Sequence, residues 1–141
     1  MREFKFLLFL LFLGLFIGCD SSTSISQSIC PQCNMPIPES KEQSSHLNKK
    51  TYFDDMGCLI LWTKEEGKDP TVAMVFTKDT KHYIKATDAH YTINERTPMG
   101  YGFTAYEKAQ DKSIKFDEVK LRMLRGEHMA NPKIRKQILG E

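Results

Sequence analysis

The chain has 141 residues, a formal net charge of +2 and 27% charged residues. This balance excludes the strongly basic surface of a nucleic-acid-binding protein and a polybasic membrane patch. The length is that of one domain with a buried core, and no stretch after the first 18 residues is apolar enough to span a bilayer.

An N-terminal targeting segment is the first predicted element. Basic residues precede an apolar run over residues 6–17, which is too short to cross a ~30 Å hydrocarbon core as a helix. The residues Phe16-Ile17-Gly18 before Cys19 resemble a bacterial lipobox, in which the cysteine is acylated and becomes the first residue of the mature protein. The alternative is an ordinary signal peptide with a chance cysteine near its cleavage site. We predict a lipoprotein signal peptide over residues 1–18 and lipidation of Cys19, which would hold the protein at a membrane surface outside the cytoplasm.

The lipidated cysteine and a flexible linker are predicted over residues 19–29, because Asp20 to Ser28 is rich in Ser and Thr and nearly free of apolar residues. Fully extended, this linker reaches about 30 Å. The folded domain is predicted over residues 30–141.

Within this domain the sequence predicts an α+β fold in which short strands alternate with helices. The predicted strands cover residues 46–53, 71–76, 83–86, 91–93 and 114–116. The predicted helices cover residues 56–66, 104–112 and 117–125, and a last one begins at Asn131-Pro132.

Helix caps support these helix boundaries. Asp54 or Asp55 is the expected N-cap of the first helix, which Gly67 closes. Thr104 and Glu107 match a capping box at the start of the second helix, and Asp117 is the expected cap of the third. Capping explains the paired aspartates fully, so we assign them no catalytic role.

The sharpest chemical motif is Cys30-x-x-Cys33-x-Met35, which opens the domain on a Pro-rich turn. Three soft sulfur donors within six residues favour Cu(I). A structural disulfide and a redox-active dithiol are the open alternatives, although no βαβ pattern accompanies the motif. Zinc is less favoured, because no second Cys or His pair completes a four-ligand set.

Two further sulfur residues are candidates of a weaker kind. Met99 lies between Pro98 and Gly100, where it is either a metal ligand or a filler of an irregular gap in the core. Cys58 lies on the first turn of the first predicted helix, and we interpret it as a small buried apolar residue. With Cys19 lipidated, an odd number of three cysteines remains, which argues against a pure disulfide framework.

In the order of its motifs the chain resembles the NosL family of lipid-anchored copper chaperones, encoded alongside nitrous-oxide reductase. The resemblance rests on the lipobox at Cys19, the Cys30-x-x-Cys33-x-Met35 motif, Phe53-Asp54-Asp55 before a helix, and Thr97-Pro98-Met99-Gly100. The family usually has Gly where this chain has Asn34, the commonest non-glycine residue at positive φ. The resemblance implies an α+β fold of two small ββαβ-type modules packed as one domain.

It also implies a function: a non-enzymatic Cu(I)-binding chaperone at the periplasm-facing membrane surface. We expect Cys30, Cys33, Met35 and Met99 as its copper ligands, and nitrous-oxide reductase or its membrane assembly complex as its partner, with no nucleic acid or small-molecule substrate. The alternatives are a thiol–disulfide redox protein that uses Cys30 and Cys33, and a structural zinc or disulfide module that binds another protein.

Overall fold

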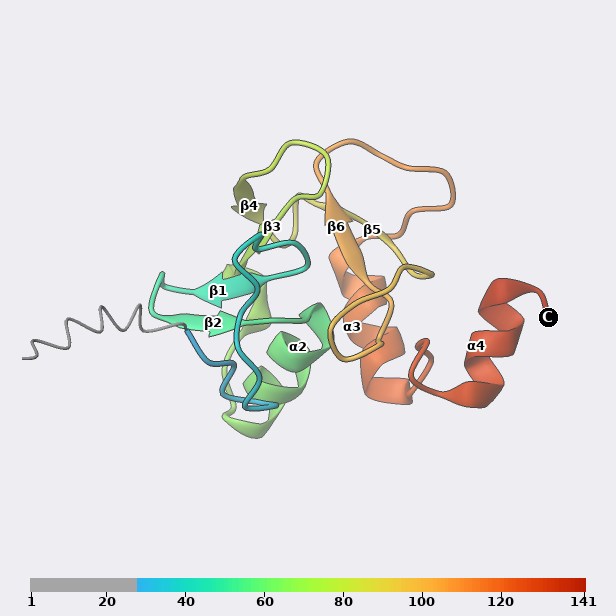
Figure 1. Ribbon diagram of the computed structural model, residues 1–141, viewed down its shortest axis with the longest axis horizontal. Coiled ribbons are helices and arrows are strands. Elements are labelled where there is room, and N and C mark those ends of the chain that lie inside the picture. Colours follow the sequence, from blue (N-terminus) through green and yellow to red (C-terminus); the bar gives the residue numbers. More distant parts are fainter. Residues whose placement is uncertain (1–27) are drawn as a thin grey trace, which may run out of the picture.

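A computed structural model describes residues 28–141 (Figure 1). The predicted signal peptide, the predicted lipidation site Cys19 and most of the predicted linker therefore lie outside the described residues. Between residues 28 and 141, no helix is both long and apolar enough to cross a membrane. Mixed helices and antiparallel strands confirm the α+β class.

Six short strands and three α-helices make up the described part of the chain. The strands are β1 (Ser45–Leu47), β2 (Thr51–Phe53), β3 (Met74–Phe76), β4 (Tyr83–Lys85), β5 (His90–Thr92) and β6 (Thr104–Tyr106). The helices are α2 (Met56–Glu65), α3 (Phe116–Arg125) and α4 (Pro132–Leu139), with a 3₁₀ turn, η2 (Pro70–Val72). The order β1-β2-α2-β3 is present, but no described strand follows α3, so the predicted second ββαβ module is not confirmed.

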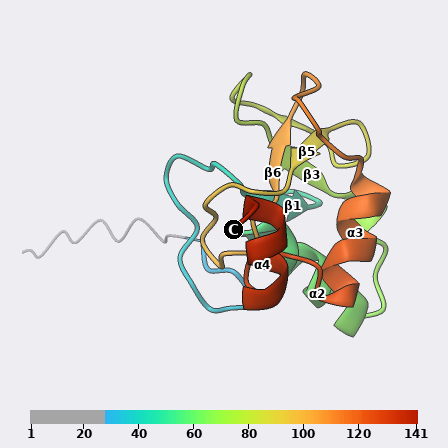
Figure 2. The same cartoon turned by 90° about the vertical axis from the view of Figure 1, so that its right-hand side faces the viewer.

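The strands form two antiparallel sheets. The larger has the order β2-β1-β3-β4, and the smaller pairs β5 with β6. Helix α2 packs on β1 and β2 and lies beside α3, as Figure 2 shows, so the buried core forms between the sheets and these two helices. Its largest fully buried apolar side chains include Phe53, Leu59, Val75, Phe103 and Phe116.

The predicted starts of α2 and α4 are confirmed, because the residues that cap them lie next to these helices in the sequence. Asp55 is the N-cap of α2, and its carboxylate accepts a hydrogen bond from the Gly57 amide at 3.0 Å. Gly67 follows the helix with a φ of 62°, in the left-handed region that glycine adopts at low cost. Asn131 caps α4 through the Lys133 amide, as its Asn-Pro start predicts.

The predicted strand over residues 46–53 is wrong, since the segment is a β-hairpin. Lys50 donates its amide hydrogen to the Leu47 carbonyl at 3.1 Å, and the residues between them, Asn48 and Lys49, have φ values of 53° and 54°. Positive φ at both central positions is the requirement of the tight turn whose twist suits a hairpin. The strand predicted over residues 71–76 is likewise divided, into η2 and β3.

The predicted helix over residues 104–112 is also wrong. Thr104 and Ala105 are buried in β6, where Thr104 pairs with Thr92 of β5. The strand predicted over residues 114–116 is a single bridge between Ile114 and Tyr91, and Phe116 already begins α3. Lys115, not the predicted Asp117, is therefore at the N-cap position of α3.

Candidate metal centre

The first two cysteines lie on a closed loop, residues 30–36, which we call the cysteine loop. The Cys30 amide donates to the Met35 carbonyl, and the Asn34 amide donates to the Cys30 carbonyl, both at 2.9 Å. Asn34 has a φ of 60°, as expected for a residue that replaces glycine in a turn. These bonds close the chain between Cys30 and Met35, so the two cysteines are held on one short turn.

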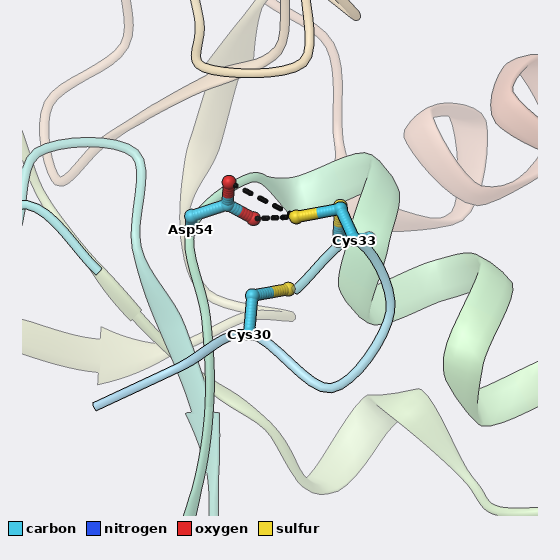
Figure 3. A group of neighbouring side chains, drawn as sticks. Cys30, Cys33 and Asp54 are labelled. Carbon is cyan, nitrogen blue, oxygen red and sulfur yellow. Dashed lines mark hydrogen bonds between the residues drawn. The ribbon is translucent and has the colours of Figure 1, made fainter. Parts of the chain in front are cut away.

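The cysteine loop lies against the start of α2 (Figure 3). This part of the chain supplies two more donors. Asp54 immediately precedes the N-cap residue, and Cys58 lies four residues further on. One ligand atom from each of Cys30, Cys33, Asp54 and Cys58 lies within 4.8 Å of all the others. We call these four residues the cysteine cluster.

Burial differs within the cysteine cluster. Cys30, Asp54 and Cys58 are fully buried, whereas Cys33 is only partly buried. The Cys33 thiol donates to both carboxylate oxygens of Asp54 at 3.3 Å (Figure 3). The cluster is therefore closed toward the core and reached from solvent on the Cys33 side.

The three thiols have different acidities. A hydrogen bond from Cys58 lowers the pKa of Cys30 to about 6, because it stabilises the Cys30 thiolate more than burial disfavours it. The same hydrogen bond, together with burial, raises the pKa of Cys58. Burial raises the pKa of Cys33 to about 11. Cys30 is thus the most acidic of the three thiols and the first to lose its proton, which favours an incoming cation.

The donor set fits a metal ion. All three cysteines among the described residues are free thiols, so each sulfur is available for coordination. Four ligands about 2.3 Å from a tetrahedral metal are about 3.8 Å apart, a spacing that the cluster can reach with small side-chain shifts. The cysteine cluster can therefore hold a metal ion.

The structure brings together only part of the predicted ligand set. Cys30 and Cys33 meet as predicted. The Met35 side chain is 44% exposed on the same loop, and Met99 lies half-buried on the segment before β6. The Met99 amide donates to the Asp55 carboxylate at 3.0 Å, which places its main chain beside the start of α2. Coordination by the two thioethers stays a prediction.

Two members of the cluster, Cys58 and Asp54, are not among the ligands predicted from the sequence. The sequence favoured an apolar core role for Cys58 and a helix-capping role for Asp54. Their spacing gave no usable signal, because Asp54 precedes the N-cap and the i, i+4 rule for a shared helix face applies only to residues inside the helix. The contact also depends on the cysteine loop, which packs on the start of α2.

One surface hollow, of about 460 Å³, lies away from the cysteine cluster. It is lined by side chains of α3 and α4 together with Ile93 and Glu127, and none of these residues belongs to the cluster. The four donor atoms of the cluster lie within 4.8 Å of one another, a spacing that suits a single ion.

No family model, curated protein or solved structure matches this chain.

Proposed function

We propose that this protein binds Cu(I) in the cysteine cluster and passes it on as cargo. The single observation that carries the proposal is the convergence of three free cysteine sulfurs on one point, two of them buried and one open to solvent. Soft thiolate ligands select soft ions, and Cu(I) accepts two or three of them.

The mixed exposure of the sulfurs suits transfer. Buried Cys30 and Cys58 can hold the ion away from water, while Cys33 offers a sulfur that an incoming thiol or thioether can replace. Binding must also release protons from Cys33 and Cys58, since the bound forms are thiolates. Metal binding is sufficient to account for the convergence of these side chains, so we propose a chaperone and not an enzyme.

The destination of the copper is proposed from the resemblance to the NosL family. We propose delivery to nitrous-oxide reductase or its membrane assembly complex, from a periplasm-facing membrane to which acylated Cys19 anchors the chain. A linker that reaches about 30 Å lets the domain meet a membrane-associated partner without detaching. Mass spectrometry of membrane-extracted protein tests the anchor, and Cys19→Ser should release the protein or stall its processing. A Cys19→Ser protein that is still processed and membrane-bound would disprove lipid anchoring through this residue.

One observation favours a second candidate, a structural Zn(II) site. Asp54 adds a buried carboxylate to the three sulfurs, which gives four donors of the types that zinc uses. A structural zinc ion would be needed for folding, whereas copper cargo would not, so chelation distinguishes the two candidates. Unfolding of the full-length protein on zinc removal would favour this second candidate.

The direct test is anaerobic titration of the reduced full-length protein with Cu(I), in competition with a chromogenic chelator, and in parallel with Zn(II). We expect one tightly bound Cu(I) per chain. Met99→Ala measures the predicted thioether, and equal Cu(I) affinity of this variant and the parent would remove Met99 from the ligand set. A protein that binds no Cu(I) in competition with the chelator would contradict the proposal.

The biological test is deletion of the gene in its own host during respiration on nitrous oxide. We expect a reductase that is made and exported but short of copper. A fully metallated and active reductase at limiting copper would contradict the delivery role and leave metal binding to be explained in another way.

A further inference from the structure

Asp55 joins two parts of the chain that are far apart in sequence. Its side chain is fully buried, and one carboxylate oxygen accepts the Gly57 amide of α2 at 3.0 Å. The other oxygen accepts the Met99 amide, also at 3.0 Å, and the Thr97 side chain contributes a further hydrogen bond to the carboxylate. One buried carboxylate thus fixes residues 97–102, which we call the Met99 segment, to the start of α2.

A second contact holds the same segment. Gly57 has no side chain, and a Cβ at this position would lie 2.2 Å from the Cδ2 atom of Tyr101. The Tyr101 ring therefore packs directly on the backbone of α2, one residue before Cys58. On its other side the ring meets His128 edge-on at 4.9 Å, and the Tyr101 carbonyl accepts the Met129 amide at 3.1 Å.

Both attachment points of the Met99 segment adjoin cluster residues along the chain, so the segment lies close to the start of α2, which carries Asp54 and Cys58. Asp55 follows Asp54, and Gly57 precedes Cys58. The electrostatics agree with this placement, because burial, followed by electrostatic interactions with Cys58, Asp55 and Cys33, raises the pKa of Tyr101 to about 12. The phenol next to the cluster is therefore neutral at physiological pH.

We propose that Asp55 is a positioning residue that holds the Met99 segment as a cover over the cysteine cluster, and that this cover limits the rate at which metal enters and leaves. The inference rests on the proposed metal binding and concerns its kinetics. A cover slows the entry and the exit of the metal ion together and leaves the equilibrium affinity unchanged. A ligand slows only the exit of the ion and therefore raises the affinity.

Asp55→Asn is the main test. Asn is as good an N-cap as Asp, so it can keep the hydrogen bond from Gly57, but its amide group has one acceptor oxygen in place of two. We expect Cu(I) transfer from the full-length protein to a chromogenic chelator, and Cu(I) uptake, each to become about tenfold faster, the effect of one lost buried hydrogen bond. Affinity should change less than threefold. Asp69→Asn is the matched control, because Asp69 caps η2 through Thr71 at the surface.

A second variant keeps the test decisive if Asp55→Asn does not fold. Gly57→Ala adds a good helix former to α2 while its Cβ displaces the Tyr101 ring, and we expect the same acceleration of uptake and transfer. Unchanged rates in a folded Asp55→Asn or Gly57→Ala protein would overturn the proposal. A slower uptake, or a loss of affinity as large as the gain in release rate, would overturn it as well.

A measurement without metal separates this inference from the proposed function. In the metal-free protein, alkylation of buried Cys30 and Cys58, followed by mass spectrometry, reports how often the cover opens. We expect faster alkylation of both in Asp55→Asn than in Asp69→Asn, whatever ion the cluster binds. Equal alkylation in the two variants would contradict the cover, even where Cu(I) binding itself is confirmed.

Discussion

Replacing Cys58 with alanine separates metal binding from packing, because this fully buried thiol lies on α2 and belongs to the cysteine cluster. In the metal-free protein the change removes one buried sulfur and leaves a small cavity, so we expect a loss of about 1–2 kcal/mol in the free energy of unfolding. Ile60→Val is the matched control, since it trims a buried side chain of the same helix at a similar cost of about 1 kcal/mol and leaves the cluster intact.

The two variants should differ when metal is present. Loss of a direct ligand should weaken Cu(I) affinity on the order of 100-fold or more, since even residues that only support ligands cost 10- to 100-fold. At a free Cu(I) concentration of 100 times the parent Kd, binding adds about 2.7 kcal/mol of stability to the parent and to Ile60→Val, but only about 0.4 kcal/mol to Cys58→Ala.

Denaturant unfolding of the full-length protein, with and without buffered Cu(I), measures these differences. Equal stabilisation of Cys58→Ala and Ile60→Val by Cu(I) would refute the role of Cys58 as a ligand. Cys58 would then be an apolar core residue, as the sequence predicted.

Three further predictions concern the cluster charge, a buried histidine and a close backbone contact. Asp54→Asn removes the negative oxygen donor, so we expect Zn(II) affinity to fall at least tenfold and Cu(I) affinity to change less, as competition titrations would show; equal losses for both ions would contradict a sulfur-dominated copper site. Burial and the nearby Lys49 charge lower the pKa of His46 below its usual 6.5. Below about pH 6.5 the unfolded chain therefore binds a proton that the folded chain does not, so the free energy of unfolding should fall with falling pH until the pKa of folded His46 is reached. His46→Phe should flatten this pH dependence in denaturant titrations, and an unchanged slope would assign the pH dependence to other groups. Gly102 has a φ of 94°, and a Cβ there would lie 2.6 Å from the Ile93 carbonyl oxygen, so Gly102→Ala should cost about 2 kcal/mol or more in the free energy of unfolding; a cost near zero would show that this loop relaxes freely.

Local signals in the sequence predicted the elements that depend on local interactions. Helix α2 follows from apolar spacing, the Asp55 cap and Gly67, and α4 follows from Asn131-Pro132. The Thr104–Glu107 capping box failed because pairing of β6 with β5, a contact distant along the chain, outweighed a local preference for helix.

The candidate site also has one part that local sequence spacing predicted and one part that depends on a contact between distant segments. Cys30 and Cys33 share one turn, so their spacing alone predicted that they meet. Cys58 and Asp54 join them only because the cysteine loop packs on the start of α2, and no local pattern contains that contact. The same limit explains why the paired aspartates looked alike in sequence, although Asp55 caps the helix and Asp54 faces the sulfurs.

The proposed function requires that the three cysteine sulfurs bind one soft metal ion. X-ray absorption spectroscopy at the copper edge, on full-length protein loaded anaerobically with one equivalent of Cu(I), identifies the atoms that bind the ion. We expect a first shell dominated by two or three sulfur atoms at roughly the 2.3 Å typical of metal–thiolate bonds, and a lower sulfur count in Cys58→Ala. A first shell made of nitrogen or oxygen, or a sulfur count that Cys58→Ala leaves unchanged, would contradict the account.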